Sequence, residues 1–583
     1  MDAPVRQLAL ADAGGAATQP GRRRAATVHV LILGSFLVPI AVGLAGTALA
    51  AFGCLPAVGG DMLTLAPWRM LFGTPGMATS VALTVFVGLA ATALAFVLAV
   101  GFCAAGHDRM GYRRAEAMLA PLLAAPHAAM AIGLAFVLAP SGWIARLISP
   151  WLTGWEVPPD VATVGDPWGL SLIVALTVKE VPFLLLMILA ALYQIPAAEH
   201  LRAARSLGYG AAAAWIKVIL PQIYPQIRLP VYAVLAFSLS VVDMALILGP
   251  SHPPPLSIVA FRWFSAPDVA AYLPAAAAAL LQLVLVIGAI GAWRLGEVAV
   301  ARVGVRWIAC GRRETAHQPG PTLATVAVML LFALGGIALL AMAVWSFAWT
   351  WRYPAGLPDA WTLATWIHQL PALGWPARTT LSLGLLSTLV AIVLVIAWLE
   401  SEDRLGIRMT RRALWLIFIP LVVPQISFLF SIQVLLIRFG LDGTLFAVVW
   451  SHLLFVLPYV FLSLADPWRS LDPRYRRSAA ALGASPMRTL FAVKLPVLLR
   501  PILIACAIGF SVSVAQYLPT LFAGNGRVAT LTTEAVTLAS GADRRIVGVY
   551  TFLQSLLPFL GFVLALSVPA LVFLRRRALS RAA

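Results

Sequence analysis

The chain has 583 residues, of which 61% are hydrophobic and 11% are charged, and its formal net charge is +18. Its mean hydropathy of +0.92 excludes a soluble protein, because a soluble fold cannot cover that much apolar surface with so few charged residues. The positive charge suggests nucleic-acid binding, but the basic residues flank the apolar stretches and follow a membrane topology instead. The sequence therefore predicts an all-α polytopic membrane protein that binds no nucleic acid.

Twelve apolar stretches are long enough to cross the hydrocarbon core of a bilayer, which requires about 20 residues in a helix. Half of them lie in the first half of the chain and half in the second. We expect them near residues 28–53, 80–104, 117–139, 169–193, 229–249 and 274–293, and near residues 322–345, 379–399, 413–437, 443–465, 501–522 and 549–573.

Most of the 41 Lys and Arg residues fall in segments that share one side of the membrane if the N-terminus is cytoplasmic. Because basic residues stay on the cytoplasmic side, this asymmetry predicts that both termini are cytoplasmic. Residues 1–27 form an N-terminal tail that we expect to be disordered, and residues 575–583 form a basic C-terminal tail. The first apolar stretch exceeds the usual length of a signal-peptide core, so we expect a retained anchor.

The two halves of the chain repeat one pattern of loops and residues. Residues 202–221 read RAARSLGYGAAAAWIKVILP, and residues 477–496 read RSAAALGASPMRTLFAVKLP. Each half holds an even number of predicted spans, so both halves enter the membrane in the same orientation and the repeat is parallel. We expect a first half at residues 28–293, a cytoplasmic linker at residues 294–320 and a second half at residues 321–574.

Each repeated segment lies between the fourth and fifth spans of its half, on the expected cytoplasmic side. Residues 197–207 favour a helix, which Gly208 would end in a left-handed conformation. A second short helix over residues 211–219 would stop at Pro221. The resulting helix-turn-helix elbow would expose small residues to another protein, namely Ala203 and Ala204 in the first copy and Ser478, Ala479 and Gly483 in the second.

At these residues the chain resembles the permeases of binding-protein-dependent ABC importers. Their cytoplasmic motif is Glu-Ala-Ala, three residues, Gly, nine residues, and then Ile-x-Leu-Pro. Both copies match the Gly and Leu-Pro spacing without a gap, but Arg202 and Arg477 stand at the Glu position, and Ser478 replaces the first Ala of the second copy. The resemblance implies that an ATPase docks on two loops, formed by Arg202, Ala203, Ala204, Gly208, Leu220 and Pro221, and by Arg477, Ser478, Ala479, Gly483, Leu495 and Pro496.

The resemblance covers most of the chain, and the layout looks like the subgroup that fuses both halves, as in iron(III) and thiamine uptake. It implies two copies of a cytoplasmic ABC ATPase subunit, a periplasmic substrate-binding protein and a bacterial inner (plasma) membrane. The arginines at the Glu position suggest an acidic docking groove on that ATPase.

The chain lacks the residues that a nucleotide site or a metal site would need. It has no GxxxxGK[ST] phosphate-binding loop, and Lys179, Lys217 and Lys494 lie outside such a setting. Its four cysteines show neither metal-ligand nor disulfide spacing. We therefore expect no catalytic residue, no metal and no bound cofactor, with ATP hydrolysed by the partner subunits.

Charged and polar residues inside predicted spans are candidates for a translocation path, because a charge at the bilayer centre costs about 2.5–3.5 kcal/mol on insertion scales. Asp243 lies near the middle of the fifth predicted span, and the repeat pairs it with Gln516 in the eleventh. We expect the two to face each other across the pseudo-twofold axis. A helix-helix hydrogen bond explains them equally well. Lys179 and Glu180 in the fourth span are further candidates, and each is expected to find a separate partner.

Two other functions fit parts of the pattern. Parallel six-plus-six repeats also occur in secondary transporters, although such a carrier needs no paired elbows between spans four and five of each half. A passive channel or structural subunit would show no dependence on ATP. The cargo stays open between iron(III), thiamine, a polyamine and other solutes, because one carboxylate does not select among them.

Overall fold

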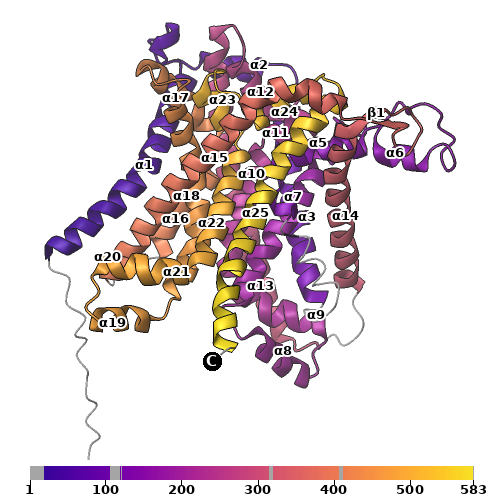
Figure 1. The fold of residues 1–583 in the computed structure, drawn as a ribbon. Helices are drawn as coiled ribbons and strands as arrows, with labels where there is room; N and C mark the ends of the chain where they lie inside the picture. The colour runs from indigo at the N-terminus through magenta and orange to yellow at the C-terminus, as the bar shows by residue number, and fades with distance from the viewer. Residues whose placement is uncertain (1–18, 106–118, 120, 314–318, 406–410, 582–583) are drawn as a thin grey trace, which may run out of the picture.

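The computed structural model describes residues 19–105, 119, 121–313, 319–405 and 411–581. Within these residues the chain is helical apart from a few turns and one short pair of antiparallel strands (Figure 1). This architecture confirms the all-α polytopic class that the sequence predicts.

The first half of the chain begins at a long N-terminal helix and ends in a still longer helix that runs into the linker. Its helices are α1 (Gln19–Ala51), α2 (Ala66–Gly73), α3 (Met77–Ala105), α5 (His127–Leu138), α6 (Trp143–Ile148), α7 (Leu170–Leu192), α8 (Ala197–Ser206), α9 (Ala211–Ala214), a π-helical turn (Trp215–Ile219), α10 (Leu220–Ser240), α11 (Asp243–Leu248), α12 (Leu256–Phe264) and α13 (Tyr272–Ala309).

The second half repeats this order and adds the two strands after its first helix. Its elements are α14 (Pro319–Phe347), β1 (Ala348–Thr350), β2 (Ala360–Trp361), α15 (Ala364–Leu405), α16 (Arg411–Val422), α17 (Ile426–Arg438), α18 (Leu445–Arg469), α19 (Pro473–Ala481), α20 (Pro486–Thr489), a π-helical turn (Leu490–Lys494), α21 (Leu495–Val497), α22 (Leu499–Val514), α23 (Leu518–Gly524), α24 (Leu531–Ala539) and α25 (Arg544–Arg581).

Nine of the described helices are long and apolar enough to cross a bilayer, and eleven spans result when each of two bent helix pairs counts as one. The sequence predicted twelve. The remaining one is the fifth span of the first half, expected at residues 229–249. There the helix ends at Ser240 and α11 starts at Asp243, and polar residues such as Gln222 and Arg228 occupy the first turns of α10. The break and this polarity divide a span that the sequence suggests is continuous.

The first helix of each half packs against the other half of the chain. Helix α1 lies along α17, and α14 lies along α5 and α3 (Figure 1). Small residues allow the close approach: a Cβ on Gly43 of α1 would lie 2.7 Å from the backbone oxygen of Phe428, and a Cβ on Gly133 of α5 would lie 2.6 Å from that of Ala338. The two halves therefore interlock rather than stand side by side.

The expected tails and linker are largely helical where the structure describes them. Helix α1 starts at Gln19, so residues 19–27 of the expected disordered tail are helical, whereas residues 1–18 lie outside the described part. Helix α13 continues to Ala309 and covers most of the linker predicted at residues 294–320, and α25 continues to Arg581. Residues 314–318 of the linker are not described.

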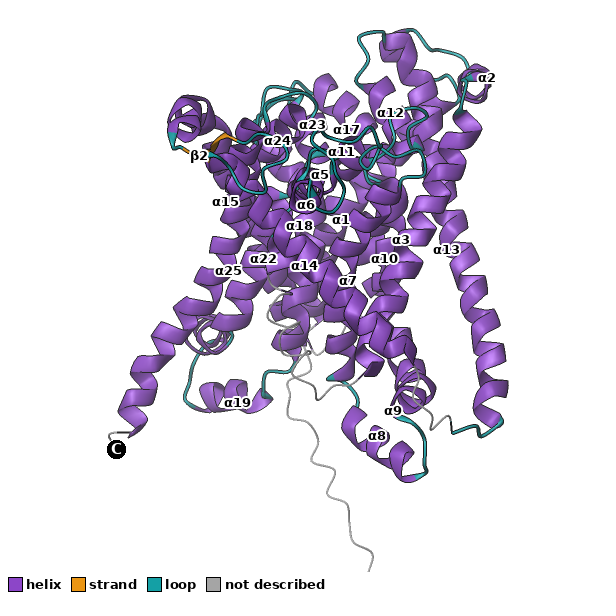
Figure 2. Cartoon of the chain, turned by 90° about the vertical axis from the view of Figure 1, so that its right-hand side faces the viewer, coloured by secondary structure: helices purple, strands orange, loops and turns teal. Residues whose placement is uncertain are grey.

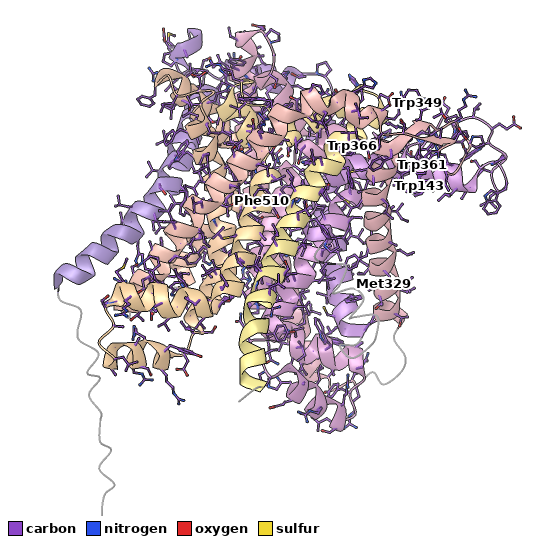
Figure 3. All side chains as sticks on the ribbon, in the orientation of Figure 1. Trp143, Met329, Trp349, Trp361, Trp366 and Phe510 are labelled. Atoms are coloured by element: carbon purple, nitrogen blue, oxygen red, sulfur yellow. The ribbon has the colours of Figure 1, made fainter. Side chains whose placement is uncertain are left out.

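Aromatic residues gather at the end of the molecule opposite α8 and α19, as Figure 3 shows for Trp143, Trp349, Trp361 and Trp366. Trp349 and Trp361 are 50% and 55% exposed, which is typical of residues at a membrane-water interface. The indole N–H of Trp143 donates to the Gly356 carbonyl at 2.8 Å. This bond ties α6 of the first half to the loop between β1 and β2 of the second.

The third span of each half is broken at a proline instead of being continuous as expected. The helix before α5 ends at Ala124 and Pro126 is the N-cap residue of α5, while α16 and α17 meet at an angle of 89° around Pro424. Proline has no N–H to donate to the carbonyl four residues earlier, so Leu122 loses its helical partner at the first break. The ammonium group of Lys179 in α7 donates to the carbonyls of Leu122 at 2.8 Å and of Ala125 at 2.7 Å. Lys179 thus satisfies the carbonyls that this break frees.

The fifth span of each half is also broken. No proline or glycine lies at the first break, whereas Pro519 is the second residue of α23 after the second break. In the first half, Gln282 donates to the Leu239 carbonyl at 3.0 Å and Ser257 donates to the Val241 carbonyl at 2.9 Å. In the second half, the hydroxyl of Thr532 donates to the Val514 carbonyl, and Gln554 donates to Thr532 at 2.8 Å. Buried side chains from neighbouring helices therefore stabilise both breaks.

Replacing Lys179 with Met should destabilise the protein by about 1–3 kcal/mol, because two carbonyls would be left without donors in an apolar interior. The measurement is the thermal unfolding midpoint of the purified chain in detergent. Glu180→Gln is the matched control, since the neighbouring side chain makes no contact with these carbonyls. An unchanged midpoint for Lys179→Met would contradict the structural role.

Candidate coupling elbows and intramembrane path

The first elbow comprises α8, the turn at Gly208, α9 and the π-helical turn. The N–H of Gly208 donates to the Arg205 carbonyl at 2.9 Å, and the N–H of Tyr209 donates to the Ala204 carbonyl at 3.2 Å. These two bonds form a Schellman cap, which requires a left-handed residue at its centre. Gly208 has φ of +83°, so the predicted glycine cap is confirmed.

The second elbow comprises α19, the turn at Gly483, α20 and its π-helical turn, and it repeats the same cap. The N–H of Gly483 donates to the Ala480 carbonyl at 2.9 Å, and the N–H of Ala484 donates to the Ala479 carbonyl at 3.0 Å. The φ of Gly483 is +78°. Both elbows project from the same end of the molecule (Figure 2), so one partner surface can meet both.

Only part of each small-residue pair reaches the surface. Ala203 and Ser478 are exposed, as are Arg202 and Arg477. Ala204 and Ala479 are 5% and 8% exposed, contrary to the expectation that both members would be available to a partner. Consecutive helix positions point about 100° apart, and the second member of each pair faces the inside of its elbow.

The most exposed apolar side chain of each elbow was missed in the sequence analysis. Leu207 is 62% exposed and Leu482 is 87% exposed, and each immediately precedes the capping glycine. The repeated Leu-Gly pair could have marked these leucines. A leucine at the end of a helix is, however, usually interpreted as packing against that same helix. An exposed leucine at the tip of both elbows favours contact with a pocket of a partner protein over contact with water.

The Leu-Pro step does not end the second helix of either elbow, contrary to expectation. The helix continues through a π-helical turn, in which the N–H of Leu220 reaches the Trp215 carbonyl and the N–H of Leu495 reaches the Leu490 carbonyl. Pro221 and Pro496 then occupy the first turn of the next helical segment, where a missing N–H removes no bond. The first elbow is therefore joined directly to α10, whereas the second is joined to α21, which meets α22 at an angle of 78°.

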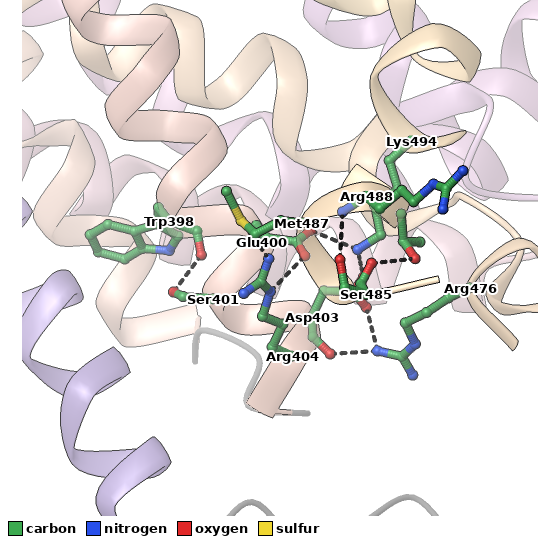
Figure 4. Close-up of polar contacts among 11 residues, drawn as sticks. Trp398, Glu400, Ser401, Asp403, Arg404, Arg476, Ser485, Met487, Arg488 and Lys494 are labelled. Atoms are coloured by element: carbon green, nitrogen blue, oxygen red, sulfur yellow. Dashed lines mark hydrogen bonds and ion pairs between the residues drawn. The ribbon is translucent and has the colours of Figure 1, made fainter. Parts of the chain in front are cut away.

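A cluster of charged residues supports the second elbow from α15 (Figure 4). Lys494 is 3% exposed, and its ammonium group lies 2.7 Å from a carboxylate oxygen of Glu400 and also pairs with Asp403. Arg476 of α19 donates to the carbonyl of Asp403 at 2.7 Å and to its carboxylate at 3.3 Å. Arg404 pairs with Glu400 at 2.8 Å. The end of α15 thus holds both α19 and the π-helical turn.

The first elbow is supported by the segment after α13 instead. The ammonium group of Lys217 donates to the Arg312 carbonyl at 2.6 Å and lies 4.1 Å from the ring centre of Trp307. The N–H of Gly210 donates to the Arg313 carbonyl at 3.1 Å. The two elbows therefore share a backbone geometry but make different contacts within the described part of the chain.

Asp243 and Gln516 lie at equivalent helix breaks rather than in the middle of continuous spans. Asp243 starts α11, and Gln516 lies between α22 and α23. The carboxylate of Asp243 lies within electrostatic range of Lys179 and of Tyr517, the neighbour of Gln516. No hydrogen bond joins Asp243 to Gln516 among the described residues. The breaks approach each other, but a direct pairing is not part of this conformation.

Lys179 and Glu180 lie within electrostatic range of each other but differ in their further neighbours. Lys179 bonds to the carbonyls before Pro126, whereas Glu180 is 6% exposed and lies within electrostatic range of Tyr459 in α18. Helices α7 and α18 are the fourth spans of the two halves. Glu180 is therefore placed toward the opposite half of the chain, and Lys179 toward its own.

His452 of α18 was not among the candidates for the path, although it holds the second break together. It is 1% exposed, and its two ring nitrogens lie 2.7 Å from the Ser513 hydroxyl and 2.9 Å from the Thr520 hydroxyl. These partners belong to α22 and α23. One imidazole thus bridges the break in the fifth span of the second half.

Comparison with known proteins provides an independent assignment. No family model matches the chain. The chain is similar to the inner membrane ABC transporter permease protein YnjC of Escherichia coli strain K12, with 33% identity over 507 residues that cover 86% of this chain and 90% of that protein.

Shorter permeases match about one third of the chain. The putative 2-aminoethylphosphonate transport system permease protein PhnV of Salmonella typhimurium strain LT2 is 23% identical over 197 residues, which cover 33% of this chain and 72% of that protein. The molybdenum transport system permease protein ModB of Mycobacterium tuberculosis strain H37Rv is 28% identical over 213 residues, which cover 34% and 78%.

These relatives are permease subunits of ATP-driven systems, which favours that function over the secondary-transporter alternative. The chain is therefore the transmembrane permease subunit of an ABC importer, forming the translocation path and coupling it to a separate ATPase. An inner-membrane relative that aligns with most of the chain, the repeated glycine-capped elbows and the helical membrane fold lead to one conclusion: the chain belongs to the family of ABC transporter permeases.

Proposed function

We propose that each elbow docks one copy of an ABC ATPase subunit, and that movement of the elbows acts on a path between the two halves near Asp243. The supporting observation is the repeat of one Schellman-capped elbow at the same end of the molecule. The chain hydrolyses no ATP itself in this proposal. A periplasmic substrate-binding protein delivers the cargo at the opposite end.

The proposed orientation places both termini and both elbows in the cytoplasm. Basic residues support it, since Arg474, Arg476 and Arg477 all lie on α19, and the positive side of a membrane protein is normally cytoplasmic. The aromatic residues at the other end then lie at the periplasmic interface. Both ATPase copies meet a basic elbow, which favours an acidic groove on the partner.

The proposed path runs between the breaks of the two fifth spans. Each break follows the helix that its elbow enters. A displacement of the first elbow reaches its break through α10 alone, whereas a displacement of the second elbow passes through α21, a 78° bend and α22. Broken helices near the middle of a bilayer are typical of binding sites in transporters, because they bring backbone and polar side chains to a shared cavity. Asp243 supplies a carboxylate at this place.

The first test is purification of the chain from membranes together with the proteins encoded beside it. We expect an ATPase to co-purify in two copies per permease, as measured by native mass spectrometry, and ATP hydrolysis to depend on that subunit. The permease purified alone is the control. Transport by the permease reconstituted without any ATPase would refute the proposal.

Reversing Arg202 or Arg477 to Glu should weaken ATPase binding by about tenfold for each elbow, since a complementary charge at the interface becomes a repulsive one. Membrane insertion should be unaffected because both side chains are exposed. Binding of the purified ATPase is measured by biolayer interferometry on nanodiscs. Arg302→Glu, at an exposed position on α13, is the matched control.

Replacing the exposed leucine of either elbow with Asp should also weaken ATPase binding. The new carboxylate would have to lose its bound water to enter the pocket of the ATPase. Leu207→Asp tests the first elbow and Leu482→Asp the second. The thermal midpoint of the permease should stay constant, since both leucines face solvent. Binding equal to that of the unmodified chain would show that the leucines lie outside the interface.

Asp243→Asn should reduce transport by about tenfold or more if the carboxylate contacts cargo or water in the path. Uptake is measured in proteoliposomes containing the ATPase and the binding protein, with the ligand that a thermal-shift screen of that binding protein identifies. Asp442→Asn, at the loop before α18, is the control. Unchanged uptake would remove Asp243 from the path and leave it a packing role.

A further inference from the structure

We propose that the segment Trp307–Arg313, which follows the membrane-crossing part of α13, forms part of the ATPase-docking surface of the first elbow and has no counterpart at the second. The occupant is the same ABC ATPase subunit, so the inference rests on the proposed function of the elbows. Its new content is that one ATPase copy contacts the linker between the two halves and the other does not.

The linker segment is fixed to the elbow by its backbone. The N–H of Gly210 donates to the Arg313 carbonyl at 3.1 Å, and the ammonium group of Lys217 donates to the Arg312 carbonyl at 2.6 Å. Lys217 is 6% exposed, and its cation also lies 4.1 Å from the ring centre of Trp307. These contacts make the linker segment and the elbow one structural unit.

The Arg313 side chain lies on the capping glycine itself. A Cβ placed on Gly208 would be 3.3 Å from Cδ and 3.4 Å from a guanidinium nitrogen of Arg313. The same arginine and its neighbours Gly311 and Arg312 are exposed. A protein that binds the elbow at Leu207 and Gly208 therefore also contacts the guanidinium of Arg313.

The second elbow has no such neighbour in the described residues. No atom lies within 4 Å of a Cβ placed on Gly483. Its buried lysine, Lys494, pairs with the carboxylates of Glu400 and Asp403 on α15 instead of with a linker carbonyl. A symmetric ATPase dimer would therefore meet two different surfaces on one permease.

The charge of the segment agrees with that of the elbow it adjoins. Arg312 and Arg313 extend the basic surface of Arg202 and Arg205, all of them exposed. An acidic groove that accommodates the elbow arginines would attract the linker arginines as well. This attraction would speed the association of the two proteins and fix their relative position. The continuity of position and of charge identifies the ATPase as the occupant.

Cys310 provides a direct test, because it is exposed within the segment. The other cysteines are removed as Cys54→Ala, Cys103→Ala and Cys506→Ala, and the permease is labelled in nanodiscs with a membrane-impermeant maleimide. Labelling is compared between the permease alone and the co-purified complex with its ATPase. Leu207→Cys and Leu482→Cys, each made in a chain that also carries Cys310→Ala, report on the elbows, and Met62→Cys, 78% exposed at the opposite end, is the control.

We expect the complex to slow labelling of Cys310, Leu207→Cys and Leu482→Cys by about tenfold or more, because a site buried at an interface reacts only when the partner dissociates. Labelling of Met62→Cys should not change. Protection of both elbow positions without protection of Cys310 would overturn the linker inference alone. Lack of protection at both elbows would overturn the docking function on which it rests.

A charge reversal provides a second measurement. The double change Arg312→Glu and Arg313→Glu should slow association of the purified ATPase by about fivefold and reduce the salt dependence of the rate, as expected for charges that steer an encounter. Arg302→Glu, on α13 before this segment, is the control and should leave the rate unchanged. An association rate and salt dependence equal to those of the unmodified chain would contradict the proposed contact.

Discussion

A backbone polar group that is freed inside a bilayer must find its partner within the protein, because the hydrocarbon region offers none. This constraint governs the arrangement of the membrane domain. The breaks before α5, α11 and α23 each free carbonyl groups, and each is accompanied by a buried donor on another helix: Lys179, Gln282 and Thr532 respectively. The broken spans can exist only where those neighbouring helices supply the donors, so the breaks and the packing of the bundle depend on each other.

The duplicated elbows could be predicted in detail because their determinants are local in sequence. A glycine in a left-handed cap specifies the turn without help from the rest of the fold, whereas the Leu-Pro step does not end the helix before it. Gly208 and Gly483 take the expected conformation. The exposure of individual small residues was predicted less well, since Ala204 and Ala479 face inward, and a one-residue step on a helix changes direction by about 100°.

The breaks of the fifth spans and the interlocking of the halves could not be read from the sequence. Residues 241–243 contain neither proline nor glycine, and Pro519 at the second break is no clear signal because α7 contains a proline without breaking. The donor that stabilises the first break, Gln282, lies 43 residues beyond its acceptor. The crossing of α1 and α14 onto the opposite halves leaves no pattern either, because all spans are similarly apolar. Glycines such as Gly43 and Gly133 mark the contacts, but a glycine in an apolar span has several possible explanations.

A single chain carrying both halves permits a difference between them that two identical subunits would not. The helix segments and caps of the elbows repeat, but a force applied to the second elbow acts through Lys494 and Arg476 on α15, within its own half. A force on the first elbow acts through Lys217 and Gly210 on the segment that joins α13 toward α14. Because α14 packs on α3 and α5 of the first half, the linker connects that elbow to the seam between the halves. The two elbows therefore contact different parts of the described bundle, although they have the same backbone geometry.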